Sequence, residues 1–269
     1  MSKKPDFLVI GAAKSGTSSI HNYLSQHPEI SVPKIKETFF LVGDKKKLGD
    51  GKGIYGKNIP SSFEDYMKLF KKNRICGEVC TAYLYFYKST IKNIKKHLGN
   101  PKIVIILRNP LERSFSNYLH HVRDNIEFFS FEKALENEKR RKKEGWWWGF
   151  QLNEVSLYSK QVKNYLKNFD DVKIILFEDF KDNEKEKMKE IYNFLGADPS
   201  FIPDTSIKLN VTGVPTNRFY NLLFNEGLFK RLLRRMLYII PIKKIEKIKY
   251  FASKKLLKNP QFLNKQDKI

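Results

Sequence analysis

The chain has 269 residues, 41% hydrophobic and 30% charged, which is typical of a globular protein with one substantial core. Its 51 Lys and Arg residues outnumber its 29 Asp and Glu residues, and the net charge of +22 favours acidic partners: nucleic acid, anionic lipid, acidic small molecules or polysaccharides. The first strand follows MSKKP directly and no apolar run is long enough to span a membrane, so we expect a cytoplasmic protein.

The first predicted elements are a strand, a glycine turn and a helix. Residues 7–10 are apolar, residues 20–27 (IHNYLSQH) have the pattern of an amphipathic helix, and Gly11 and Gly16 allow a sharp turn between them. The first amides of a helix have no intrahelical acceptor and therefore point at any bound anion. The cation of this turn is Lys14, and its hydroxyl groups are those of Ser15, Thr17 and Ser18. The turn therefore predicts a site for a phosphate-like group; the alternative is an ordinary turn with a solvated lysine.

Strands and helices alternate along the rest of the chain. This alternation predicts a three-layer, P-loop-like α/β fold, with a central parallel sheet flanked by helices. The expected strands are residues 30–33, 74–80, 102–107 and 172–180, and the expected helices are residues 61–72, 89–99, 111–125, 129–145, 155–169 and 184–196. Cys76 and Cys80 are expected to be reduced core thiols, because neither they nor the five histidines have zinc-site spacing.

Three polar residues follow three different predicted strands, and ligands of parallel sheets bind beyond the carboxyl ends of the strands. These residues are Lys14, Glu78 and Arg108. In the Walker pattern the lysine follows the second glycine, whereas Lys14 precedes Gly16. Arg108 stands where an Mg-NTPase commonly carries an acidic metal ligand. A cation at this position repels Mg²⁺ and attracts a second phosphate group. The hydroxyl of Ser116 would reach the same phosphate. Two anion sites fit a nucleotide that bears both a 5′ anhydride and a 3′-phosphate, with no metal.

These residues resemble a known family, the PAPS-dependent sulfotransferases, and in particular the branch related to heparan sulfate sulfotransferases and their bacterial relatives. Three motifs carry the resemblance: GAAKSGTSSIHNYLSQHP to the 5′-phosphosulfate loop, ILRNPLERSFSNYLHH to the 3′-phosphate motif, and KETFF to a Lys-Glu segment. Weaker similarities are GEVCTAYL, LYSKQVKNYLKNF with ILFEDF, and NFLG with LNVTG. Together the motifs span residues 6–218, and we expect residues 1–218 to form the sulfotransferase domain.

The resemblance implies a donor, 3′-phosphoadenosine 5′-phosphosulfate (PAPS), a product, PAP, and no metal. It implies that Lys14 is catalytic, neutralising charge on the bridging oxygen, and that Glu37 is the general base that deprotonates an acceptor hydroxyl or amine. The acceptor it implies is a carbohydrate or a related polar molecule, with no nucleic acid partner. The residues assigned to the donor are Lys14, Ser15, Gly16, Thr17, Ser18, Arg108 and Ser116.

The chain also departs from the family pattern near the expected acceptor. Val79 stands where heparan-type members often carry lysine, the pair Cys80-Thr81 replaces Ser-Pro, and Phe39 replaces a histidine of many relatives. These changes leave open the acceptor, the sulfated position and the choice between O- and N-sulfation. The oligomeric state is open as well.

Two site residues have simpler interpretations. Glu37 is alternatively a surface carboxylate, and Arg108 is alternatively only an ion-pair partner. Glu37 would then form a salt bridge with Lys34 or Lys36. Arg108 would form one with Glu112 or Asp124. His21 is expected to pack in the first helix rather than to act as a base.

Two further segments have unassigned roles. Trp146, Trp147 and Trp148 would alternate faces in a strand, and they either stack on an acceptor or anchor a long loop. Residues 219–269 form a basic tail with thirteen Lys or Arg and three Asp or Glu residues, and an apolar stripe predicts helices. We expect this tail to pack on the domain; the alternative is contact with an anionic membrane at its inner face.

The sequence thus predicts a cytoplasmic PAPS-dependent sulfotransferase. Two other classes remain as alternatives. The first is a P-loop kinase or NTPase, which would bind Mg-ATP. The second is a basic nucleic-acid or membrane adaptor, whose binding would be salt-sensitive and independent of Lys14 and Glu37.

Overall fold

The computed structural model describes residues 3–49, 59–70, 74–206, 214–215 and 257–258. The chain divides into two compact units, one of residues 1–114 with 137–205 and the other of residues 115–136 with 206–269. Of the predicted tail, only the short strand β7 (Leu257–Lys258) is described, and it pairs antiparallel with β6 (Val214–Pro215). The predicted tail helices lie outside the described residues.

The first unit is built on a five-stranded parallel sheet with the strand order β2-β3-β1-β4-β5. Leu8 of β1 lies opposite Glu78 of β3 and Ile103 of β4, so the carboxyl ends of these three strands meet at one edge. The strands are β1 (Phe7–Val9), β2 (Ile30–Ser31), β3 (Ile75–Val79), β4 (Lys102–Leu107) and β5 (Val172–Leu176). The predicted parallel sheet is confirmed.

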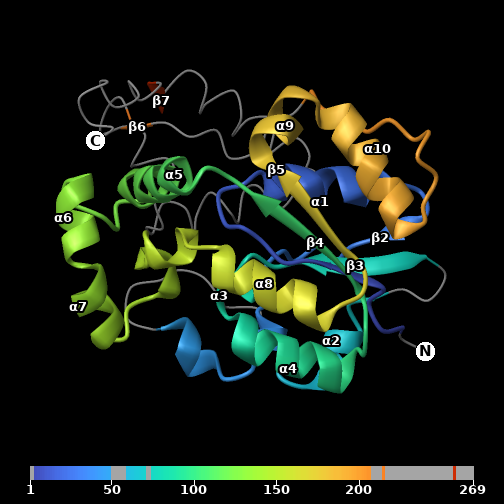
Figure 1. Cartoon of the computed structure of the whole chain (residues 1–269), viewed down its shortest axis with the longest axis horizontal. Helices are drawn as coiled ribbons and strands as arrows, with labels where there is room; N and C mark the ends of the chain where they lie inside the picture. Colours follow the sequence, from blue (N-terminus) through green and yellow to red (C-terminus); the bar gives the residue numbers. More distant parts are fainter. Residues whose placement is uncertain (1–2, 50–58, 71–73, 207–213, 216–256, 259–269) are drawn as a thin grey trace, which may run out of the picture. The chain divides into compact units, whose positions relative to one another are not determined.

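Helices cover both faces of this sheet (Figure 1). On one face lie α1 (Thr17–Gln26), α9 (Phe177–Asp182) and α10 (Glu184–Leu195). On the other lie α3 (Ala82–Tyr85), α4 (Tyr87–His97) and α8 (Ser159–Asn168), together with α2 (Phe63–Met67). The three-layer α/β architecture predicted from the sequence is therefore present.

The core of the sheet is apolar on both sides, as expected for a parallel sheet covered by helices. Residues 103–106 of β4 are all fully buried. One cluster packs β1 and β4 against α1 and α10; its members include Phe7, Val9, Ile20, Leu24, Val104, Ile106, Met188 and Ile191. Cys76 and Cys80 are free and buried, as predicted. Gly77 is required where β3 meets β1, because a Cβ there would collide with the carbonyl oxygen of Phe7.

The remaining elements of the first unit are short. They are α7 (Glu138–Lys143) and four 3₁₀ turns, η1 (Phe40–Val42), η2 (Lys45–Leu48), η3 (Trp148–Phe150) and η4 (Glu154–Ser156). Helix α5 (Pro110–Arg123) begins in the first unit and continues into the second. Within the second unit, the rings of Phe115 and Tyr118 on α5 pack against Phe131 of α6 (Phe131–Glu136).

Several predicted boundaries are wrong. The strand expected over residues 172–180 ends at Leu176, because Glu178 and Asp179 favour the first turn of a helix, and α9 begins there. The helix expected over residues 129–145 is divided into α6 and α7 at Asn137. Trp148 begins the turn η3, and the helix expected from residue 155 begins at Ser159.

Candidate active site

The loop between β1 and α1 has a left-handed backbone conformation at two positions. Gly16 caps α1 with a φ of 76°, in the left-handed region, and Lys14 also has a positive φ of 69°. A Cβ at Gly16 would lie 3.1 Å from the ring of Phe177, so glycine is favoured for space as well as for conformation. Ser15 is fully buried, and its Oγ has no hydrogen-bond partner among the residues that the structure describes. The loop therefore presents an unused hydroxyl at the amino end of a helix.

Arg108 follows β4 directly and reaches this loop. Its Nη1 donates to the main-chain carbonyl oxygen of Lys14 at 3.1 Å, and its guanidinium lies 4.8 Å from the ring centroid of Phe177. Its Nε is buried and has no partner within the described part of the chain. The alternative pairing with Glu112 is present but long, at 3.5 Å, and Glu112 is 48% exposed. The structure therefore brings the two predicted cationic positions together.

Ser116 lies on α5 and is buried, but it belongs to the second unit of the chain. Its assignment to the 3′-phosphate stays a prediction. Thr17 and Ser18 begin α1 immediately after the loop, where the sequence places them.

Glu37 lies at the carboxyl edge of the sheet, beside the end of β3. Its backbone N–H donates to the carbonyl of Val79 at 3.2 Å. Its Oε2 accepts from the amide of Thr81 at 2.8 Å, and its Oε1 accepts from the hydroxyl of Thr81 at 3.0 Å. Lys36 Nζ pairs with Oε1 at 2.6 Å, so the predicted ion pair with Lys36 is also present. The carboxylate is held by two neighbours and is still 22% exposed, within reach of an incoming molecule.

The segment that holds Glu37 also contacts the loop between β1 and α1. Cys80 donates its amide to the carbonyl of Val9 at 2.9 Å, and Leu84 donates to that of Ile10 at 2.9 Å. A Cβ at Gly11 would lie 2.8 Å from that of Leu84. Residues 80–84 therefore connect the loop on one side with Glu37 on the other.

The three tryptophans are packed against other aromatic rings. Trp147 meets Phe39 edge-on at 5.5 Å, and Trp148 stacks on Tyr85 at 5.9 Å. Trp146 is half-buried beneath the guanidinium of Arg141, at 4.9 Å. These contacts agree with the interpretation that the tryptophans anchor a loop; they also place Trp147 beside the segment that contains Glu37.

His21 is part of the packing, as expected. Its Nε2 lies 2.9 Å from the carbonyl oxygen of Pro33, and burial lowers the pKa of its imidazole. In the described ranges, no group of three or more His, Cys, Asp or Glu side chains is placed to hold a metal ion. No helix in these ranges is both long enough and apolar enough to cross a membrane.

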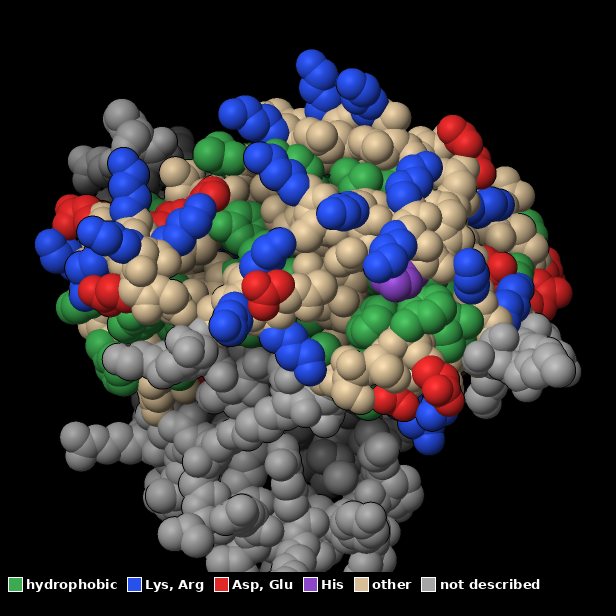
Figure 2. Space-filling model, turned by 90° about the horizontal axis from the view of Figure 1, so that it is seen from below, with side chains coloured by type: hydrophobic (Ala, Val, Ile, Leu, Met, Phe, Trp, Pro, Cys, Tyr) green, Lys and Arg blue, Asp and Glu red, His purple; other side chains and the backbone are tan. Residues whose placement is uncertain are grey.

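Seven of the 51 Lys and Arg residues lie on two neighbouring helices, α4 and α8, which contain no acidic residue. Figure 2 shows the face of the molecule on which they lie, with Lys and Arg side chains spread over it. Their exposed lysines are Lys88, Lys92, Lys95, Lys96, Lys160, Lys163 and Lys167. This arrangement agrees with the acidic partners expected from the net charge.

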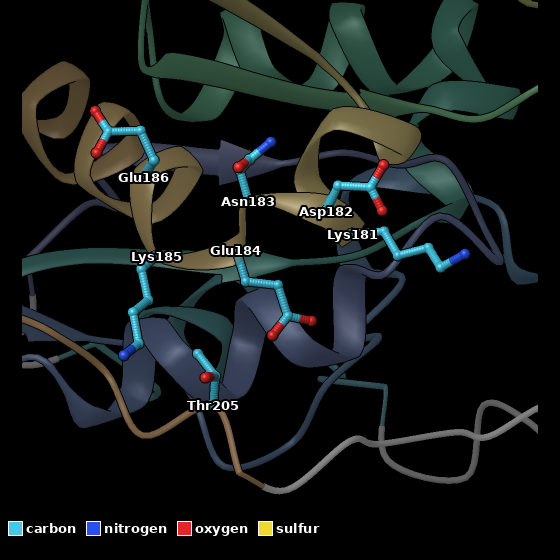
Figure 3. Close-up of a pocket in the computed structure, with 7 residues that line it drawn as sticks. All are labelled: Lys181, Asp182, Asn183, Glu184, Lys185, Glu186 and Thr205. Atoms are coloured by element: carbon cyan, nitrogen blue, oxygen red, sulfur yellow. The ribbon is translucent and has the colours of Figure 1, made fainter.

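A surface hollow lies where α9 meets α10, apart from the residues assigned to the active site (Figure 3). It is lined by Lys181, Asp182, Asn183, Glu184, Lys185, Glu186 and Thr205. Basic and acidic side chains both line this hollow, so its charge favours neither an anionic nor a cationic ligand.

The fold and the loop define a P-loop-like α/β protein, with an arginine after the strand that neighbours the loop strand. Residues 4–212 match the family model of the sulfotransferase domain, and the chain belongs to this family. The resemblance seen in the sequence motifs is thus confirmed.

Solved structures and curated relatives agree with this family. A sulfotransferase from Alicyclobacillus acidocaldarius superposes with a TM-score of 0.71 at 36% identity, over 77% of this chain and 87% of that chain. Human carbohydrate sulfotransferase 15 is 24% identical over 72% of this chain and 44% of its own length. Human heparan sulfate glucosamine 3-O-sulfotransferase 5 is 27% identical over 61% of this chain and 45% of its own. The chain spans less than half the length of these curated relatives.

Proposed function

We propose that this protein transfers the sulfuryl group of PAPS to a hydroxyl or amine of a carbohydrate or related polar acceptor. The observation that carries this proposal is the contact between Arg108 Nη1 and the Lys14 carbonyl, at 3.1 Å. It joins the two cationic positions at one edge of the sheet, beside the buried Ser15 Oγ and Arg108 Nε, neither of which has a hydrogen-bond partner in the part of the chain that the structure describes. Unused buried donors at such a point suit a multiply anionic nucleotide.

The donor would be held at its two ends. Lys14, Ser15 and the amino end of α1 would bind the 5′-phosphosulfate, and Arg108, with Ser116, would bind the 3′-phosphate. An arginine suits this second role because its planar guanidinium forms two parallel hydrogen bonds with a phosphate. The same arginine disfavours the competing NTPase, because it would repel the Mg²⁺ that accompanies ATP.

The transfer would proceed by in-line displacement at sulfur. Glu37 would take the proton from the acceptor while the acceptor oxygen or nitrogen forms its bond to sulfur. The bond between sulfur and the bridging oxygen breaks at the same time, and PAP leaves with the electron pair. Lys14 would neutralise the charge that develops on that oxygen. Thr81 would orient Glu37, since its amide and hydroxyl both donate to the carboxylate.

A carbohydrate acceptor is supported by the relatives, whose names include a carbohydrate sulfotransferase and a heparan sulfate glucosamine 3-O-sulfotransferase. The lysines of α4 and α8 favour an acceptor that is itself acidic. The cytoplasmic location and the membrane contact of the tail stay predictions.

Calorimetric titration of the full chain with PAP, with ADP and with Mg-ATP, at matched salt, tests the proposal. We expect PAP to bind tightly and the other two to bind at least about tenfold more weakly, since one charged hydrogen bond is worth about 1.5–3 kcal/mol. Preferential binding of Mg-ATP would contradict the proposal and indicate a kinase or NTPase. If none of the three nucleotides binds, the result would favour the alternative of a basic nucleic-acid or membrane adaptor.

Replacing Arg108 by alanine is expected to weaken PAP binding by about 10–100-fold, because the charged hydrogen bonds to the 3′-phosphate are lost. Binding of adenosine 5′-monophosphate, which has no 3′-phosphate, should change by less than about threefold. The matched control is Arg140→Ala, which removes an exposed arginine paired with Glu144 at 2.9 Å. An equal loss for both nucleotides would contradict the assignment of Arg108.

A further inference from the structure

Glu78 is a fully buried carboxylate that the proposed reaction does not use. It lies in β3, 1% exposed, and burial raises its pKa. Three hydroxyl groups donate to it: Thr38 to Oε2 at 2.6 Å, and Tyr66 and Tyr83 to Oε1 at 2.7 Å each. Both oxygens of a group that is costly to bury are thus fully engaged.

The donors to Glu78 connect it to the turn that carries Glu37. Thr38 follows Glu37 directly in the chain and is fully buried. Its Oγ1 lies 3.1 Å from the Tyr83 hydroxyl, and that hydroxyl in turn accepts the amide of Leu41 at 3.2 Å. The segment after Glu37 is therefore hydrogen-bonded to Glu78 in two ways, directly through the Thr38 side chain and indirectly through the Leu41 amide and the Tyr83 hydroxyl.

This turn needs such support because its backbone is strained. Glu37 has a φ of 63° and Phe39 has a φ of 55°, both in the left-handed region that non-glycine residues rarely adopt. Thr38 lies between the two strained residues and points into the core. Such conformations persist only where surrounding contacts hold them, and one such contact is the 2.6 Å hydrogen bond from Thr38 to Glu78.

We propose that Glu78 is a positioning residue, which acts through Thr38 to keep the Glu37 carboxylate aligned on Thr81 and facing the acceptor. This inference rests on the proposed role of Glu37 as the base. Glu78 itself would touch neither donor nor acceptor.

Two isosteric substitutions separate positioning from mere stability. Thr38→Val removes the hydroxyl that links Glu78 to the turn. Tyr66→Phe removes another hydroxyl from the same carboxylate, but Tyr66 lies on α2, outside the turn, and its ring stacking on Phe40 at 4.6 Å is kept. Both variants lose one hydrogen bond to the buried carboxyl group of Glu78, so both are expected to melt at a lower temperature.

The readout is the Thr81 amide in proton–nitrogen NMR spectra of the full chain, because this amide donates to Glu37 Oε2. We expect Thr38→Val to accelerate its hydrogen exchange by about tenfold or more, and Tyr66→Phe to change it by less than about twofold. Thr38→Ser, which keeps the hydroxyl, should restore slow exchange. An unchanged Thr81 amide in Thr38→Val, or equal acceleration in Tyr66→Phe, would overturn the proposal.

Activity provides the second readout. With PAPS and desulfated heparan sulfate as the acceptor probe, or another carbohydrate that the wild type sulfates, Thr38→Val should lower kcat about tenfold with the KM for PAPS unchanged. Tyr66→Phe should keep kcat within about twofold. If Thr81 responds as expected while Glu37→Gln keeps full activity, the proposed function of Glu37 fails and the structural link to Glu78 stands.

Discussion

Replacing Lys14 by alanine is expected to lower the rate of sulfate transfer by about 10²–10³-fold, the usual effect of losing one preorganised donor at a developing charge. The lysine would act mainly on the bridging oxygen, whose charge grows only as its bond to sulfur breaks. Binding of PAP should therefore weaken much less than the rate falls. The rate is measured with PAPS and desulfated heparan sulfate, or with another carbohydrate that the wild type sulfates, and PAP binding is measured by calorimetry.

The matched control is Lys189→Ala, which removes one exposed lysine of α10, away from α4 and α8, and the same unit of charge. It should transfer sulfate at the wild-type rate. Unchanged turnover in Lys14→Ala would remove Lys14 from the mechanism. A comparable loss in both variants would point to net charge, rather than the loop, as the determinant of activity.

Replacing Glu37 by glutamine is expected to lower kcat by about 10²–10⁴-fold, the range that general base catalysis contributes. Glutamine has the same size and its amide oxygen still accepts a hydrogen bond from Thr81, but it cannot take the proton of the acceptor. Since Glu37 would not contact the nucleotide, the affinity for PAP should stay within about twofold of the wild-type value.

The control for this variant is Glu64→Gln, at a carboxylate that is 82% exposed and pairs with Lys68 on the surface. It should leave both rate and affinity unchanged. If Glu37→Gln instead loses PAP affinity at unchanged kcat, Glu37 has a structural role, and the base must be sought among other groups near Thr81.

Some sequence predictions were wrong where local signals compete. The apolar segment VKIIL is followed by FEDF, which has two further apolar residues. A prediction based on apolar residues alone therefore extends the strand through both segments. The structure ends β5 at Leu176 because the two acidic residues that follow favour a helix start. The role of the tryptophan segment could not be predicted, because the rings of Trp147 and Trp148 pack on residues far away in the chain, which no local pattern records.

The sequence by itself determined the order of strands and helices, the parallel sheet and the glycine turn between β1 and α1. These features depend on local chemistry: a buried run in β4, glycines that allow a left-handed turn, and a helix whose first amides lack acceptors. Since parallel strands align their carboxyl ends, the sequence also placed Lys14, Glu78 and Arg108 at one edge.

Only the tertiary structure decided which of these side chains meet. Arg108 contacts the Lys14 carbonyl across 94 residues of chain because β4 lies beside β1. Glu37 is oriented by Thr81, 44 residues away, and its turn is fastened to Glu78, 40 residues from Thr38. Near Glu37 the sequence shows only neighbouring lysines and an aromatic pair. The strained backbone there, and the buried carboxylate that supports it, come from packing between distant segments, and a local pattern does not encode such contacts.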